Sequence, residues 1–152
     1  MPNVYGVKIT KDEHDFAVSV RDLPEVCTFG NTYEDALILA EDAVHAVVCY
    51  RIEQGADLPV PSPVLDGEVA MALPLHIEAK VELYRAWRAS RISKSELARR
   101  MQVHETEVRR ILTPSHATRI ETLDRAFKAL GYKASLSIYH PAAERGALSQ
   151  TC

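Results

Sequence analysis

Apolar and polar residues alternate in the first part of the chain, at the spacing of two that is typical of half-buried β-strands. VYGVKI at 4–9 and FAVSV at 16–20 both alternate and are joined by the polar stretch KDEHD, which predicts a β-hairpin. A turn around Pro24 and a short strand at 26–29 follow, and Gly30 and Asn31 end that strand. EVAMAL at 68–73 alternates again and predicts a fourth strand.

The apolar spacing changes to three and four after residue 32. Thr32 with Asp35 resembles a capping box at a helix start, and Gly55 suits the position after the helix end. The stripe predicted to face the core comprises Ala36, Leu39, Ala40, Ala43, Val44, Val47 and Tyr50. Prolines within LPVPSPV exclude a further helix at 58–64. The order β-β-β-α-β predicts an α+β layer in which one helix covers a small antiparallel sheet.

Helical spacing dominates from residue 74 onward. Pro74 suits the first turn of a helix that we expect to connect two parts of the chain. Ser93 with Glu96 forms a capping box for a short helix, and a second short helix is predicted from about Glu105 to Leu112 after a break at Gln102. Each of these three helices has a predicted buried face. It comprises Ile77, Val81, Tyr84 and Trp87 in the connecting helix, Leu97, Ala98 and Met101 in the first short helix, and Val108, Ile111 and Leu112 in the second.

Two short helices across a turn of three to four residues are typical of a helix-turn-helix. Gln102 stands where this turn often has glycine, and a non-glycine residue at positive φ costs about 1 kcal/mol. The alternative is a small helical bundle with a solvated basic face. In a helix-turn-helix the second helix enters the major groove, and the candidates for base contacts are Glu105, Thr106, Arg109 and Arg110. The candidates for phosphate contacts are Arg91, Lys94, Arg99, Arg100 and Arg119.

The last part of the chain predicts a helix and a strand. Thr118 with Glu121 resembles a third capping box, and Gly131 ends the helix. ASLSIY at 134–139 alternates as a strand without a partner in its own half. We therefore expect it to pair with the same strand of a second protomer, through Ala134, Leu136 and Ile138. The expected domains are an acidic α+β domain at 1–73, a connecting helix at 74–90, a helix-turn-helix and dimerisation domain at 91–140, and a disordered tail at 141–152.

Charge is divided between the two halves of the chain. Residues 1–78 contain 4 Lys and Arg against 14 Asp and Glu, a net charge of −10, and residues 79–152 contain 14 against 7, a net charge of +7. The formal net charge of −3 hides this division. Because charges more than about 8 Å apart are largely screened at physiological salt, each half presents its own field. This division predicts two different partners.

Other chemistry is not indicated by the sequence. No apolar run approaches the roughly 20 residues needed to cross a bilayer. Cys27, Cys49 and Cys152 are widely spaced, which favours a reducing cytoplasm, and we expect the first two to be small buried hydrophobes. The histidines at 14, 45, 76, 104, 116 and 140 lack ligand spacing, and no phosphate-binding or nucleophile motif occurs. We therefore expect no cofactor and no metal.

Taken together, these features make the sequence resemble the HicB-type antitoxins of bacterial toxin-antitoxin pairs, in the subgroup with a helix-turn-helix. The resemblance covers residues 4 to about 139 and rests on FAVSVRDLPEVCTFGNTYEDAL, LPVPSP, ELARRM and SHATRIETLDRAFKALG. It implies that the first half has a partial ribonuclease-H-like fold and occludes a small basic toxin that cleaves mRNA. It also implies that the second half binds operator DNA and represses the operon.

An acidic surface can compete where a basic toxin holds RNA phosphates. The candidates for that surface are Asp22, Glu25, Glu34, Asp35, Glu41 and Asp42. A metal nuclease, which needs an acidic residue on the first strand, is disfavoured because residues 4–9 have none; we expect no enzyme activity. The remaining alternative is a one-component repressor whose acidic domain senses a small ligand. A neighbouring reading frame for a small basic protein would distinguish the two, because a ligand sensor needs no such companion.

Overall fold

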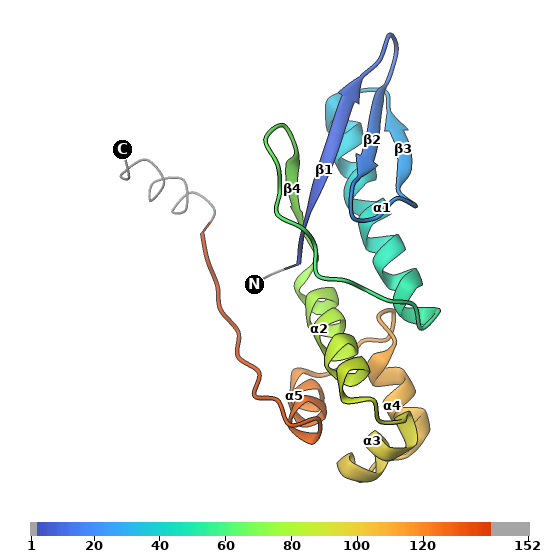
Figure 1. Ribbon diagram of the computed structural model, residues 1–152, viewed down its shortest axis with the longest axis vertical. Helices are drawn as coiled ribbons and strands as arrows, with labels where there is room; N and C mark the ends of the chain where they lie inside the picture. Colours follow the sequence, from blue (N-terminus) through green and yellow to red (C-terminus); the bar gives the residue numbers. More distant parts are fainter. Residues whose placement is uncertain (1–2, 141–152) are drawn as a thin grey trace.

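The computed structural model describes residues 3–140, and the predicted tail at 141–152 lies outside them. The first part is an antiparallel sheet with one face covered by a long helix (Figure 1). Its strand order is β3-β2-β1-β4, with β1 at Val4–Lys11, β2 at Phe16–Val20, β3 at Cys27–Gly30 and β4 at Val69–Ala72. The predicted hairpin, third strand and fourth strand are therefore confirmed, with shifts of one or two residues at their ends.

The register of the sheet separates a buried face from an exposed one. Val7 lies opposite Val20, and both side chains are buried, whereas Lys8 lies opposite Ser19 and both are exposed. Successive side chains of a strand point to opposite faces, so the apolar set faces α1 (Tyr33–Glu53). Cys27 lies opposite Ser19 on the exposed face. The prediction that Cys27 is buried is therefore wrong, while Cys49 on α1 is half-buried.

Helix α1 begins as predicted, and its predicted stripe is confirmed for Ala36, Ala40 and Val44 but not for Leu39 and Tyr50. Thr32 Oγ1 accepts a hydrogen bond from the Asp35 backbone N–H at 3.1 Å, and Gly55 after the helix end has φ of 66°. The buried side chains recur every fourth residue: Ala36, Ala40, Val44, Val48 and Ile52. Leu39 and Tyr50, predicted to face the core, are instead 39% and 60% exposed. Residues spaced by four lie on one face of the helix, so Leu39 and Tyr50 fall beside this buried row.

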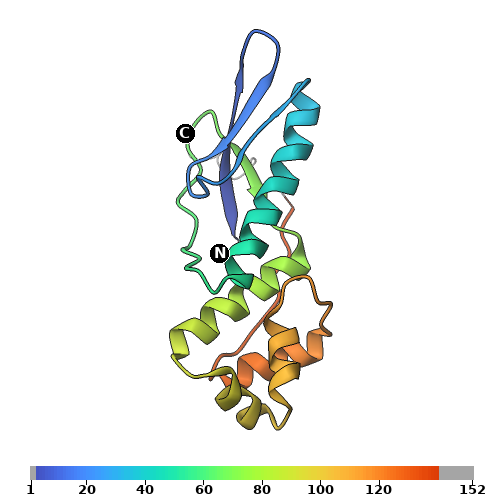
Figure 2. The same ribbon diagram turned by 90° about the vertical axis from the view of Figure 1, so that its right-hand side faces the viewer.

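Four helices complete the described part of the chain: α2 at Leu75–Ser90, α3 at Lys94–Met101, α4 at Glu105–Leu112 and α5 at Ile120–Ala129. Helix α2 lies between the sheet with α1 and the three short helices (Figure 2). Ile77 and Val81 of α2 belong to the hydrophobic cluster of the sheet, whereas Leu83 belongs to the cluster of α3, α4 and α5. Trp87 packs against both clusters, as expected for a core residue. Helix α2 thus contributes side chains to both hydrophobic cores.

One prediction for the last part of the chain is wrong, and the pairing of 134–139 with a second protomer stays a prediction. The helix cap at α5 is Arg119, without a side-chain cap hydrogen bond, because Thr118 Oγ1 instead accepts a hydrogen bond from Lys80 Nζ at 2.6 Å. Residues 132–140 form no strand within this single chain and are exposed throughout. A strand needs a neighbouring strand to receive its backbone hydrogen bonds, and none lies beside this segment in the described chain.

Candidate functional site

Helices α3 and α4 form a compact pair at the end of the molecule farthest from the sheet (Figure 1). Ser93 Oγ accepts a hydrogen bond from the Glu96 backbone N–H at 3.0 Å, which confirms the predicted cap of α3. Gln102 ends α3 with φ of 58° and ψ of 43°, so the chain does adopt the left-handed conformation expected at this turn. Val108 and Ile111 of α4 are fully buried in the cluster shared with α3. The outer face of α4 is left to polar side chains.

Helix α4 carries all four candidates for base contacts. The Arg109 guanidinium donates to Glu105 Oε1 at 2.8 Å, and Arg110 Nη1 lies 3.8 Å from Glu107 Oε2. The side chains of Arg109 and Arg110 remain 65% and 61% exposed. Exposed pairs of this kind contribute about 0–1 kcal/mol. Both guanidinium groups can therefore exchange their glutamates for another acceptor at little cost.

Glu105 is held in its ionised form. Hydrogen bonds from the Arg109 guanidinium and from Ser95 Oγ, the latter at 3.0 Å, keep the pKa of the Glu105 carboxyl below its usual range. Ser95 belongs to α3, so this contact also joins the N-terminal turns of the two helices. Thr106, the next residue along α4, is exposed.

The candidates for phosphate contacts lie at several places around α3. Arg99 and Arg100, in the last turn of α3, share Glu96 at 2.6 and 3.1 Å. Hydrogen bonds from Arg99 and then Arg100 lower the pKa of Glu96 to about 2. Lys94 Nζ lies 5.5 Å from the centroid of the Trp87 ring. Arg91 caps α2 and Arg119 caps α5, and both are exposed.

The acidic candidates divide into two groups. Glu34, Asp35, Glu41 and Asp42 are all exposed along the first half of α1. Asp22, by contrast, accepts a hydrogen bond from the Ser62 backbone N–H at 3.0 Å. Glu25 pairs with Arg51 near the end of α1 at 2.7 Å. Asp22 and Glu25 therefore also bind other parts of the chain, and the Glu25 side chain is still 47% exposed.

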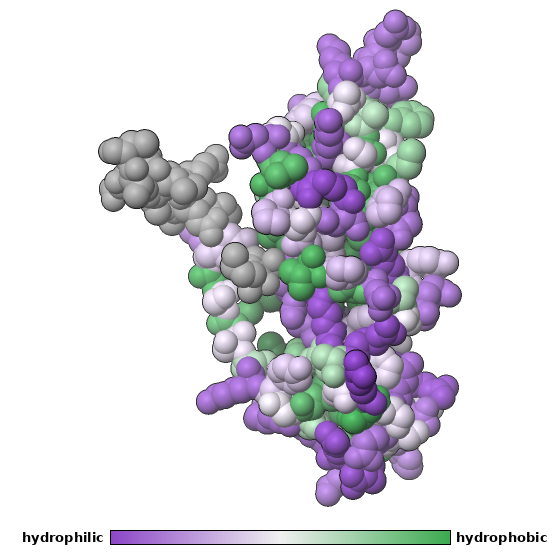
Figure 3. Space-filling view, in the orientation of Figure 1, coloured by the Kyte–Doolittle hydropathy of each residue, from purple (hydrophilic) through white to green (hydrophobic). Residues whose placement is uncertain are grey.

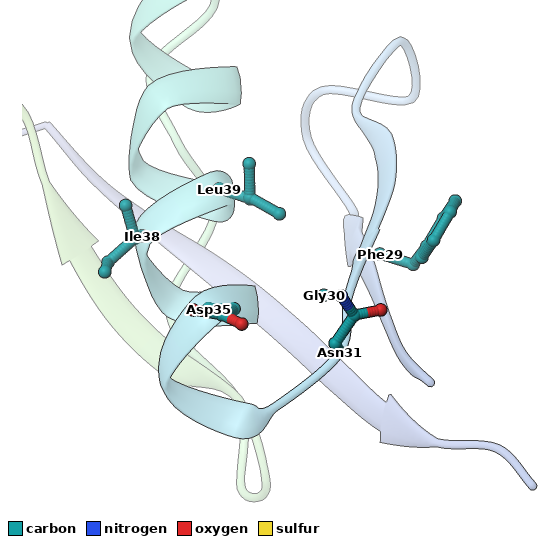
Figure 4. A pocket seen from close by; sticks show the side chains of 6 residues that line it. All are labelled: Phe29, Gly30, Asn31, Asp35, Ile38 and Leu39. Carbon is teal, nitrogen blue, oxygen red and sulfur yellow. The ribbon is translucent and has the colours of Figure 1, made fainter. Parts of the chain in front are cut away.

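Sequence reasoning missed an apolar feature beside the α1 carboxylates. A shallow hollow of about 320 Å³ lies between the end of β3 and the start of α1 (Figure 4) and is lined by Phe29, Gly30, Asn31, Asp35, Ile38 and Leu39. Leu39 extends from α1 toward β3, one helical turn after Asp35. Phe29 and Ile38 are both 61% exposed. Hydrophilic side chains surround hydrophobic ones at this end of the molecule (Figure 3).

Among residues 3–140, no group of three or more His, Cys, Asp or Glu side chains could hold a metal ion. His45 and His76 approach each other with ring centroids 6.4 Å apart, but no third ligand completes a group there. None of the described helices is both long enough and apolar enough to span a membrane.

Comparisons with known proteins extend over most of the chain. A family model described as a HicB-like antitoxin of bacterial toxin-antitoxin systems matches residues 4–82. Antitoxin HicB 2 of Photorhabdus laumondii subsp. laumondii is 39% identical over 127 residues, which cover 84% of this chain and 90% of the relative. Antitoxin HicB of Escherichia coli strain K12 is 35% identical over 133 residues, covering 87% and 96% of the two chains. The chain therefore belongs to the HicB-like antitoxin family of bacterial toxin-antitoxin systems.

Proposed function

We propose that this antitoxin neutralises a small basic, mRNA-cleaving toxin through its acidic end and represses its own operon by binding operator DNA through α3 and α4. The observation that carries the proposal is the separation of charge along the molecule. Exposed carboxylates follow α1 at one end, and exposed arginines gather on α3 and α4 at the other. Opposite fields on separate surfaces suit a cationic protein and a polyanion.

For DNA, α3 and α4 act in this proposal as a helix-turn-helix with α4 as the recognition helix. The short turn at Gln102, the buried contact through Val108 and the exposed Arg109 support this role. Arg109 would exchange Glu105 for the O6 and N7 atoms of a guanine, to which its planar fork can donate two parallel hydrogen bonds. Phosphate contacts that set the register are proposed for Arg91, Lys94, Arg99, Arg100 and Arg119.

The variant pair Arg109→Ala and Arg99→Ala tests this assignment. Arg109→Ala should cost about 1 to 3 kcal/mol on the operator and relax the base preference at one position in each half-site. Arg99→Ala should weaken binding to all duplexes alike, because phosphates carry no sequence information. Lys128→Ala, on α5 and 67% exposed, is the control for removing one positive charge. Equal losses on operator and random DNA for Arg109→Ala would refute the base-reading role.

For the toxin, the proposed contact surface is the first half of α1 with the hollow beside β3. Binding energy in protein interfaces concentrates in apolar anchors, whereas exposed charges mainly set orientation and association rate. Ile38 and Phe29 would supply the anchors, and Glu34, Asp35, Glu41 and Asp42 would face basic side chains of the toxin. Asp22 and Glu25, which also bind Ser62 and Arg51, are proposed for the same contact.

The toxin surface can be tested with the product of any reading frame for a small basic protein found beside the gene. Ile38→Asp should weaken its binding at least tenfold, because a carboxylate would replace a central apolar contact. Ile120→Asp is the matched control: Ile120 is 67% exposed on α5, at the other end of the molecule. Unchanged affinity for Ile38→Asp, measured by calorimetry, would remove the hollow from the interface. Absence of binding by the unaltered chain would reject toxin neutralisation itself.

Dimerisation through the segment at 134–139 remains part of the proposal. Leu136 and Ile138 are 59% and 89% exposed, and a second copy could cover them by pairing with this segment. Ile138→Asp should shift the chain toward a monomer in sedimentation equilibrium and weaken operator binding. Ser137→Asp adds the same charge at the intervening position and serves as the control. Ala134 would lie on the same face of the paired segment and is proposed to take part in the same pairing. A dimer that withstands Ile138→Asp would contradict dimerisation through this segment.

A further inference from the structure

A buried lysine joins the connecting helix to the end of α4. Lys80 lies on α2 and is only 3% exposed. Its Nζ atom donates to the backbone oxygen of Ile111 at 2.5 Å and to that of Arg110 at 3.2 Å. It also donates to Thr118 Oγ1 at 2.6 Å. All three ammonium hydrogens therefore have an acceptor, and each acceptor is a neutral oxygen.

This environment is costly for a positive charge. Within residues 3–140, Lys80 forms no ion pair, and burial lowers the pKa of its ammonium group to about 8. A buried charge without a counterion costs free energy, which hydrogen bonds only partly offset. The two backbone acceptors lie at the C-terminal end of α4, where the helix dipole also favours a cation. The Lys80 side chain therefore contributes more to the relative position of α2 and α4 than to the net stability of the fold.

The three contacts hold two segments that carry proposed DNA-contacting residues. Arg110 and Ile111 are in the last turn of α4, close to Arg109. Thr118 directly precedes Arg119, and the segment between α4 and α5 passes beside the start of α2 (Figure 2). Val108 and Ile111 hold α4 against α3 through apolar packing, which is not directional. The hydrogen bonds to Lys80 are directional and fix the end of α4 relative to α2.

We propose that Lys80 is a positioning residue for operator recognition: it fixes the end of α4 and the segment before α5, so that the arginines of α4 meet the base edges. This inference rests on the proposed DNA-binding function. Bidentate hydrogen bonds to bases require accurate placement, whereas the attraction of phosphates for arginine is long-range and tolerates small displacements. Loss of Lys80 should therefore reduce sequence preference more than general DNA affinity.

The test compares Lys80→Met with Lys128→Met in the full chain. Methionine has nearly the length of lysine without its charge or hydrogen-bond donors, so the core stays filled. Lys128 is 67% exposed and its replacement changes the net charge equally. The probes are a duplex from the DNA upstream of the gene and a scrambled duplex of the same composition. Lys80→Met should lose about tenfold in affinity for the upstream duplex and match Lys128→Met on the scrambled one.

The outcomes separate this inference from the proposed function. An unaltered chain without preference for the upstream duplex would overturn operator binding and the role of Lys80 together. Preference by the unaltered chain that Lys80→Met retains in full would overturn only the role of Lys80. If Lys80→Met does not fold, Thr118→Val decides, because it removes one acceptor and should reduce the same preference about threefold. An unchanged preference in Thr118→Val would then overturn the inference.

Discussion

Two residues that adopt a left-handed backbone conformation allow stability and DNA binding to be separated. Arg91, which ends α2, and Gln102, which ends α3, both have φ of 58°, and they are the only non-glycine residues with positive φ among those described. An L-residue in this conformation pays roughly 1 to 2 kcal/mol that glycine does not. Glycine in turn loses about 0.4 to 1 kcal/mol more chain entropy on folding. Arg91→Gly and Gln102→Gly should each raise the free energy of unfolding by about 0.5 to 1 kcal/mol.

The two variants should differ on DNA. Arg91 is a proposed phosphate contact, and its loss from both protomers of a dimer should reduce the slope of log affinity against log salt by about 2. Gln102 is neutral and lies at the same backbone conformation, so Gln102→Gly should leave that slope unchanged. Urea unfolding gives the stabilities, and fluorescence anisotropy on a labelled duplex from 50 to 200 mM salt gives the slopes.

Two results would refute this reasoning. A lower free energy of unfolding for both glycine variants would show that the left-handed conformation carries no strain at these positions. Equal salt slopes for Arg91→Gly, Gln102→Gly and the unaltered chain would show that Arg91 does not contact phosphate. Arg91→Gly is expected to be more stable than the unaltered chain and yet to bind DNA less well. A general loss of folding cannot produce this combination.

Three further predictions concern packing and pH. Gly30→Ala should destabilise the chain by about 1 to 3 kcal/mol in urea unfolding, because the added Cβ would lie 2.4 Å from the Ala36 backbone nitrogen; unaltered stability would contradict that close approach. Leu97→Ala, fully buried, should cost about 2 to 5 kcal/mol, whereas Ile120→Ala, 67% exposed, should stay within about 0.5 kcal/mol. The pKa of Lys80 is about 8 in the folded chain against 10.5 ordinarily, so the unfolded chain binds more protons between these values. The free energy of unfolding of the unaltered chain, relative to that of Lys80→Met, should therefore rise by up to about 3 kcal/mol from pH 8 to 10.5. If this difference in free energy does not change with pH, the low pKa of Lys80 is contradicted.

Local patterns predicted most elements of the fold. The alternation at 4–9 and 16–20 locates β1 and β2, and the capping residues Thr32 and Ser93 locate the starts of α1 and α3. These signals act over a few residues and can be read without knowledge of the tertiary structure. The edges of the buried stripe of α1 could not be read in this way, because Leu39 and Tyr50 fit helical spacing as well as Val48 and Ile52 do.

Long-range contacts explain what the sequence could not predict. Thr118 has the spacing of a helix cap, but its hydroxyl oxygen accepts a hydrogen bond from Lys80, which lies 38 residues earlier. Asp22 and Glu25 belong to the acidic half by count, yet their partners are Ser62 and Arg51. Charge counting therefore predicted the sign of each end of the molecule and did not show which carboxylates bind other parts of the chain.

The exposed residues at 134–139, which are predicted to form a strand, depend on a contact between two chains. Their alternation predicts a strand whose backbone partner comes from a second protomer. A single chain therefore shows the apolar side chains Leu136 and Ile138 without the sheet that would cover them. The sedimentation experiment on Ile138→Asp addresses this point directly.

We expect this chain, whose formal net charge is −3, to bind DNA through a locally basic surface. The most direct test is the affinity of the full chain for its upstream duplex as salt increases from 50 to 200 mM. If a dimer contacts six to ten phosphates, affinity should fall by about 10³ to 10⁵ over this range. Absence of binding at 50 mM salt, or an affinity that does not change with salt, would contradict the claim.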